Sequence, residues 1–92
     1  VDLSFVYQLV DNKEKMEILA EKLLAQKFFS LDTETTGIDP ITAELVGMSF
    51  SFAENQAFYV PVPANREEAL TIVNIFKPAF ENPDSLKIGQ NI

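Results

Sequence analysis

The chain is 92 residues long, which is enough for one small domain. Hydrophobic residues make up 47% of it and charged residues 23%, a balance that is typical of folded globular proteins and argues against disorder. Histidine and cysteine are absent, which excludes imidazole general bases, zinc sites built from these residues, and disulfides. No apolar run approaches the roughly 20 residues that cross a bilayer, and no secretory signal is recognisable.

The net charge is -7, from 14 acidic and 7 basic side chains. A protein that binds nucleic acid through its own basic surface has the opposite balance. Two explanations stay open: the partner is not a polyanion, or metal ions and other parts of a longer protein supply the positive charge.

The N-terminal half predicts a strand, a helix and a second strand. Residues 4–9 are rich in aromatic and β-branched side chains, as strands are. A helix over residues 12–26 follows, begun by a capping box of Asp11 and Glu14. Residues 27–34 then predict a strand, which turn-forming residues interrupt at 35–40. The apolar face of the helix repeats at helical spacing and comprises Met16, Leu19, Ala20, Leu23 and Leu24.

The C-terminal half predicts a hairpin, a second helix and a last strand. Residues 44–53 and 57–62 read as two strands joined by a tip at 54–56. Asn65 and Glu68 form a second capping box, and Pro78 is expected to kink or end the helix that follows. A turn at 82–84 leads to a strand at 86–90. The apolar face of this helix comprises Ala69, Ile72, Val73, Phe76 and Phe80.

The element order β-α-β-β-β-α-β predicts an α/β fold with a mixed sheet. Three consecutive strands form an antiparallel meander, and the crossover helix should return the last strand parallel to the central one. Helices are expected on the faces of the sheet. Phenylalanines at strand or helix periodicity are expected in the core rather than on a base-stacking surface: Phe28, Phe29, Phe50, Phe52, Phe58, Phe76 and Phe80.

Asp32 and Glu34 are the most informative polar residues. Strand side chains alternate, so both carboxylates point to one face, with Cα atoms roughly 7 Å apart, while Phe29 and Leu31 point into apolar packing. Two carboxylates this close repel unless one is protonated or a cation lies between them. A hard divalent ion such as Mg²⁺ or Mn²⁺ needs only oxygen ligands. The alternative is an ordinary solvated pair of acids at a strand end.

Four segments resemble one family. Residues 29–37 (Phe-Ser-Leu-Asp-Thr-Glu-Thr-Thr-Gly) resemble the first motif of the DnaQ-like 3′-5′ exonucleases, which have a ribonuclease H-like fold. Residues 44–52 and 58–62 look like the next two strands of the proofreading domains of bacterial DNA polymerases I. Residues 87–91 (Lys-Ile-Gly-Gln-Asn) resemble the start of the second exonuclease motif.

The resemblance implies a function in proofreading. These domains hydrolyse the 3′-terminal phosphodiester of single-stranded or frayed DNA, release nucleoside monophosphates, and use two divalent metal ions (Mg²⁺ or Mn²⁺, with Zn²⁺ as a further option). By match to the motif, Asp32 and Glu34 are the catalytic metal ligands, with Asp32 bridging both ions. The substrate-binding positions are Thr35, Ile38, Gln90 and Asn91. The implied partners are a DNA 3′ end and a polymerase domain of the parent chain, and the implied location is the bacterial cytoplasm.

The family pattern extends further than this sequence. The second motif continues to an aspartate beyond Asn91, and a third motif supplies a tyrosine and another aspartate. We therefore expect residues 1–92 to be the N-terminal portion of a single exonuclease domain that is truncated before its C-terminal part. Alone it should be inactive or nearly so, bind metal weakly, and self-associate through a strand edge or an apolar face. Two alternatives stay open: a catalytically silent structural or interaction module, and a stand-alone exonuclease similar to ribonuclease D that acts on RNA.

Overall fold

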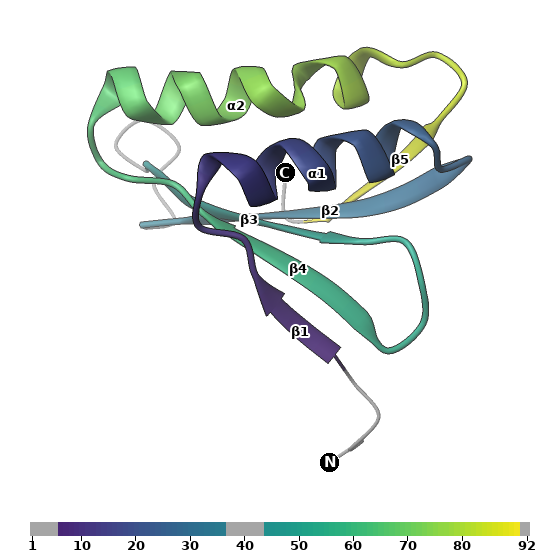
Figure 1. The fold of residues 1–92 in the computed structure, drawn as a ribbon. Coiled ribbons are helices and arrows are strands. Elements are labelled where there is room, and N and C mark those ends of the chain that lie inside the picture. Colours follow the sequence, from purple (N-terminus) through teal and green to yellow (C-terminus); the bar gives the residue numbers. More distant parts are fainter. Residues whose placement is uncertain (1–5, 37–43, 91–92) are drawn as a thin grey trace.

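The computed structural model describes residues 6–36 and 44–90, except for the side chains of Val6 and Gln90. Two helices and five strands follow one another in the predicted order, β-α-β-β-β-α-β (Figure 1). The elements are β1 (Val6–Leu9), α1 (Lys13–Leu24), β2 (Phe28–Thr35), β3 (Leu45–Ser51), β4 (Gln56–Pro61), α2 (Arg66–Glu81) and β5 (Leu86–Gln90). Asn55 at the tip between β3 and β4 has a φ of 59°, a left-handed conformation that asparagine tolerates.

The strands form one mixed sheet in the order β1-β4-β3-β2-β5. Strands β2, β3 and β4 are the predicted antiparallel meander, β1 pairs parallel with β4, and β5 pairs parallel with β2. The prediction that the last strand lies parallel to the central strand was wrong. Strand β3 is the central one, and both of its edges are already paired with β2 and β4. The crossover keeps the direction of β4, which is also that of β2, so β5 adds to the free edge of β2.

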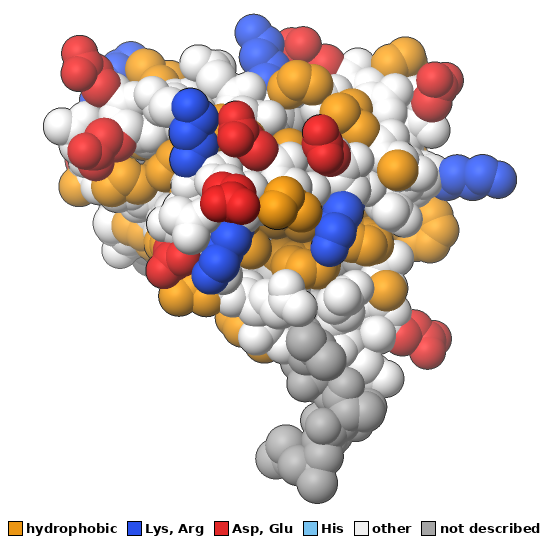
Figure 2. Space-filling model, viewed as in Figure 1, with side chains coloured by type: hydrophobic (Ala, Val, Ile, Leu, Met, Phe, Trp, Pro, Cys, Tyr) orange, Lys and Arg blue, Asp and Glu red, His pale blue; other side chains and the backbone are white. Residues whose placement is uncertain are grey.

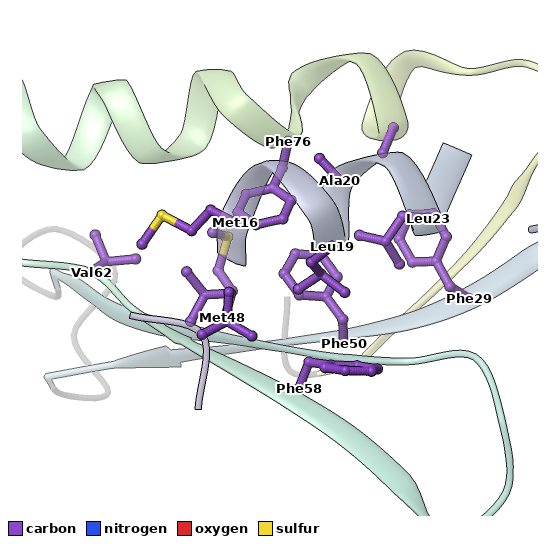
Figure 3. Close-up of a cluster of buried hydrophobic side chains, with 13 residues drawn as sticks. Met16, Leu19, Ala20, Leu23, Phe29, Met48, Phe50, Phe58, Val62 and Phe76 are labelled. Atoms are coloured by element: carbon purple, nitrogen blue, oxygen red, sulfur yellow. The ribbon is translucent and has the colours of Figure 1, made fainter. Parts of the chain in front are cut away.

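Both helices cover the same face of the sheet, and the core lies between the two layers (Figure 1). Phe50, near the end of β3, stacks on Phe76 of α2 with ring centroids 5.0 Å apart and also contacts Phe29 and Phe80. Figure 3 shows side chains from α1, α2 and the sheet converging there. The buried apolar residues are Val10, Met16, Leu19, Ala20, Leu23, Phe29, Met48, Phe50, Phe58, Val60, Val62, Phe76 and Ala79.

The start of α1 differs from the prediction. Asn12, not Asp11, caps the helix: its side-chain oxygen accepts a hydrogen bond of 2.8 Å from the backbone N–H of Lys15. Asp11 instead forms an exposed ion pair with Lys15 at 3.8 Å. Leu24, predicted on the buried face, is 41% exposed because it lies in the last turn, at the margin of the apolar stripe.

The start of α2 is as predicted, and of the two outcomes expected at Pro78, a kink or an end, the structure excludes the end. The Asn65 side chain accepts a hydrogen bond of 3.0 Å from the backbone N–H of Glu68. Pro78 does not end the helix, which continues to Glu81. Proline removes one backbone hydrogen bond near the C-terminal end, and the burial of Phe76 and Ala79 on either side of it holds the last turns against the core.

The opposite face of the sheet carries neither helix. By strand alternation this open face receives Phe28 of β2, which is 57% exposed, so its predicted place in the core was wrong. Exposed Leu86 and Ile88 of β5 lie in register with Phe28 and Ser30 at one side of this face. None of the described helices is long and apolar enough to span a membrane. Self-association through an edge or this face stays a prediction.

Candidate functional site

Asp32 and Glu34 lie near the end of β2, on the open face of the sheet. Strand β2 has partners on both sides, β3 and β5; Asp32 is paired with both strands, and Glu34 is paired with β3. Asp32 stands opposite Ser49 of β3, and Glu34 stands opposite Gly47. Asp32 is partly buried and Glu34 is exposed. The predicted common face of the two acids follows from this register, with Phe29 fully buried on the other side.

Asp32 has an unsatisfied carboxylate oxygen. Its Oδ1 is buried and accepts no hydrogen bond from any residue that the structure describes. It borders a hollow of about 90 Å³ on the open face, whose other lining residues include Ser30, Ser49 and Ser51. The hydroxyls of Ser30 and Ser51 do not donate to this oxygen. Ser30 donates to the backbone oxygen of Ser51, and Ser51 donates to the backbone oxygen of Gln56. A buried carboxylate oxygen without a donor requires an explanation, and a cation is one that suits its charge.

No basic side chain neutralises the pair of acids within residues 6–36 and 44–90. The ion pairs found there lie on the helices, between Lys15 and Asp11 and between Lys77 and Glu81. Two carboxylates on one face, one with an oxygen left without a donor, are the donor set that a hard divalent ion takes. The described residues contain no cluster of three or more acidic ligands. The described residues therefore supply two carboxylates here, and an ion at this place would need further oxygen ligands.

The sheet is irregular directly after Glu34. The pairing of β2 with β3 shifts between Glu34 and Thr35, so that Glu34 faces Gly47 while Thr35 faces Leu45. Bulges of this kind change the direction of the strand and occur often beside active sites. The strict alternation that the sequence predicts therefore holds up to Glu34 and ends there, which leaves Thr35 exposed at the rim.

The structure brings some of the predicted substrate-binding positions to the acids. Gln90 of β5 is the direct parallel neighbour of Asp32, so the start of the second motif lies beside the first. Thr35 lies at the end of the same strand as the acids. Ile38 and Asn91 fall outside the described residues.

Sequence reasoning missed the surroundings of the acids. Alternate serines on β3, at positions 49 and 51, were visible in the sequence as a small polar face, but their place beside Asp32 depends on the register of two strands. The close approach of Tyr59 to Gly47 was also missed, since no local pattern signals it.

The sequence profile of a family described as 3′-5′ exonuclease matches residues 7–92. This chain belongs to that family. The match confirms the resemblance seen in the motifs. Curated relatives include DNA polymerase I of Borreliella burgdorferi, 36% identical over 88 residues, and DNA polymerase I of Pseudomonas aeruginosa, 34% identical over 92 residues. Each alignment covers 92% of this chain and 10% of the relative, so the chain spans a small part of the polymerases that it resembles.

Solved structures confirm the α/β fold of this superfamily. The catalytic core of RRP6 from Trypanosoma brucei superposes with a TM-score of 0.76 and 20% identity, covering 99% of this chain and 24% of that one. RNase D of Escherichia coli, an exoribonuclease, superposes with a TM-score of 0.67 and 16% identity over 92% of this chain and 21% of the other. Brucella melitensis NrnC with bound Mg²⁺ gives a TM-score of 0.64 at 17% identity, over 95% of this chain and 39% of NrnC.

Proposed function

We propose that this chain forms the part of a DNA polymerase I proofreading domain that carries its first metal ligands. The reaction is metal-dependent hydrolysis of the 3′-terminal phosphodiester of single-stranded or frayed DNA, with release of nucleoside monophosphates. The observation that carries the proposal is the buried Oδ1 of Asp32, which has no donor in the described structure and lies on the same face as Glu34. The type of reaction is inferred from membership of the 3′-5′ exonuclease family.

Asp32 and Glu34 would be the residues of this chain that hold the divalent ions. When bound, such ions lower the pKa of a coordinated water and stabilise the charge of the departing 3′ oxygen. The bound Mg²⁺ of the NrnC structure supports a metal of this class. Thr35 and Gln90, at the rim and beside Asp32, would contact the terminal nucleotide and the substrate strand, together with Asn91. Ile38 would place an apolar side chain against the terminal base.

We further propose that residues 1–92 are the N-terminal portion of one exonuclease domain. The described residues supply two carboxylates at the site, and the chain covers 39% of NrnC. The remaining ligands would come from segments that follow in a longer parent. The isolated chain should then be inactive or nearly so and bind metal weakly.

Other parts of the parent would also supply the basic surface for duplex DNA. Figure 2 shows acidic and basic side chains intermixed over the visible face, without a continuous basic surface. A polymerase domain is the expected partner, because the curated relatives are DNA polymerases I. We also propose a bacterial, cytoplasmic location, which the bacterial origin of these relatives supports.

An RNA-degrading enzyme is the alternative that the fold comparisons favour. Trypanosoma brucei RNase D, whose structure contains RNA U12, superposes with a TM-score of 0.57 at 19% identity over 85% of this chain and 26% of that one. At that identity the likeness concerns the fold, whereas the relatives above 30% identity are DNA polymerases. A catalytically silent module is the other alternative, and the unsatisfied Asp32 oxygen argues against it because a purely structural site gains nothing from such an oxygen.

The parent chain provides the test. Its degradation of a 3′-labelled single-stranded DNA should require Mg²⁺ or Mn²⁺ and should fall at least about 100-fold in Asp32→Asn or Glu34→Gln, as for loss of a metal ligand that orients the reaction. Asp84→Asn, which removes an acid from the turn before β5, is the matched control and should retain activity. No metal-dependent degradation by the wild-type parent would favour the silent module. Faster degradation of RNA of the same sequence would favour the ribonuclease.

A further inference from the structure

Two tyrosines from neighbouring strands stack on the open face of the sheet. Tyr7 of β1 and Tyr59 of β4 have ring centroids 6.5 Å apart and an angle of 23° between the ring planes. In the register of the sheet, Tyr59 stands opposite Ser49, which in turn stands opposite Asp32. Residues directly opposite each other in antiparallel strands share a face, so Tyr59 lies on the same face as the acids, two strands away from β2.

Tyr59 leans across β3 toward Gly47. A Cβ atom added at Gly47 would overlap the Tyr59 hydroxyl and lie 2.7 Å from the ring carbon Cε1. The hydroxyl therefore occupies the space that a side chain at position 47 would fill. Any other residue at this position would displace the ring, which gives a physical reason for glycine here.

Glu34 is the direct neighbour of Gly47 on the other side. These two residues face each other in the pairing of β2 with β3. Cβ atoms of such pairs lie about 4.5–5.5 Å apart. The Tyr59 hydroxyl lies 2.1 Å from where the Cβ of residue 47 would be, and Glu34 is the residue paired with that position. The flexible Glu34 side chain is long enough to bring its carboxylate toward this hydroxyl.

We propose that Tyr59 is a positioning residue for Glu34. For Glu34 to be held in place for a cation, the hydroxyl would turn from the backbone oxygen of Val46 and donate to the Glu34 carboxylate instead. This inference rests on the proposed function. The hydroxyl donates to the backbone oxygen of Val46 at 3.5 Å, which is at the long limit of a hydrogen bond. A bond to a charged carboxylate is about twice as strong as a neutral one, so the donor turns to Glu34.

The stack between Tyr7 and Tyr59 connects β1 to the proposed contact with Glu34. Strand β1 is one of the two edge strands of the described sheet, and its Tyr7 ring stacks on Tyr59. Tyr7 stacks on Tyr59, Tyr59 lies over Gly47, and Gly47 is paired with Glu34, so the four residues lie on four neighbouring strands. Through this stack, β1 would set the orientation of the Tyr59 ring, and Tyr59 would in turn position Glu34.

Tyr59→Phe tests the proposal in the 92-residue protein, since it removes the hydroxyl and keeps the ring. The primary measurement is the set of side-chain rotamer populations of Glu34, obtained from NMR couplings at neutral pH without metal. We expect one dominant rotamer in the wild type and averaging in Tyr59→Phe. The second measurement is Mn²⁺ affinity, followed by paramagnetic broadening of the Glu34 signals, and we expect a loss of about tenfold, the usual effect of removing an outer-shell partner. Tyr7→Phe is the matched control, because it deletes the same atom from the other ring of the stack, and it should change neither measurement.

The outcomes separate the two proposals. Unchanged Glu34 rotamers in Tyr59→Phe, or changed rotamers with unchanged Mn²⁺ affinity, would overturn the positioning role. Equal effects of Tyr7→Phe would also overturn it, because the stack rather than the hydroxyl would then be responsible. If neither the 92-residue wild type nor the parent chain binds Mn²⁺ at Glu34, the metal function fails, and the rotamers alone decide whether Tyr59 holds the acid.

Discussion

Asp32→Asn should stabilise the metal-free protein, because the wild-type carboxylate is poorly satisfied. Its Oδ1 is buried without a donor in the described structure, and Glu34 lies on the same face two residues along the strand. At roughly 7 Å, two like charges repel by about 0.6 kcal/mol in water and about 2.4 kcal/mol at an effective dielectric constant of 20. Glu34 is exposed, so the true value lies toward the lower figure.

Burial of the charged oxygen adds to this repulsion. A buried polar atom without a partner costs about 1–3 kcal/mol, but asparagine keeps an oxygen or an amide group at the same place and relieves only the part that depends on charge. We therefore expect a net gain of about 1 kcal/mol in the free energy of unfolding, or about 4–8 °C in Tm for a domain of this size. Glu34→Gln removes the repulsion and not the burial, so its gain should be smaller.

Thermal and urea unfolding, followed by circular dichroism in EDTA and again in Mg²⁺, measure these differences. Mg²⁺ at ten times its Kd should stabilise the wild type by about 1.4 kcal/mol and leave Asp32→Asn unchanged. In Mg²⁺ the wild type should therefore be as stable as Asp32→Asn or more stable, whereas in EDTA it is less stable. Asp84→Asn, the control at an exposed turn, should stay within about 0.5 kcal/mol of wild type in both conditions. Destabilisation of Asp32→Asn by 1 kcal/mol or more in EDTA would show that the carboxylate has partners and refute the reasoning.

Three further predictions concern the fold. Phe50→Ala should lower the free energy of unfolding by about 3–5 kcal/mol in urea titrations, since this fully buried ring contacts three others; a loss below 1 kcal/mol would contradict the core described here. Asn12→Ala should cost about 1 kcal/mol and Asp11→Ala less than about 0.5 kcal/mol, because the first is the helix cap and the second an exposed ion pair; the reverse order would restore the original capping prediction. Sedimentation at increasing concentration should show self-association of the 92-residue chain, and a monomer throughout would count against an uncovered apolar face.

Periodicity alone predicted the parts of the fold that depend on local pattern. Alternation placed Phe29 in the core and Asp32 on the opposite face, and the helical repeat found the buried stripe of α1 from Met16 to Leu23. The choice between Asp11 and Asn12 as cap was not decidable from spacing, because both are good caps and adjacent. Phe28 was predicted in the core because it is aromatic, although strand alternation places it on the same open face as Asp32.

The remaining features depend on which strands become neighbours. The parallel pairing of β1 with β4 and of β5 with β2 brings together segments that are far apart in the sequence, and no local pattern specifies them. The lack of a donor for Asp32 Oδ1 and the place of Tyr59 over Gly47 arise only from that arrangement. The sequence could therefore name the acids and the family, and the structure was needed to find the groups that surround the acids.

The most direct test of the metal site is anomalous diffraction from crystals of the parent chain grown with Mn²⁺. The account predicts an anomalous peak bonded to Oδ1 of Asp32 and to the carboxylate of Glu34, at the roughly 2.0–2.2 Å typical of such ligands. Carboxylates that point apart, or an Asp32 oxygen bonded to a protein donor with no ion beside it, would contradict it.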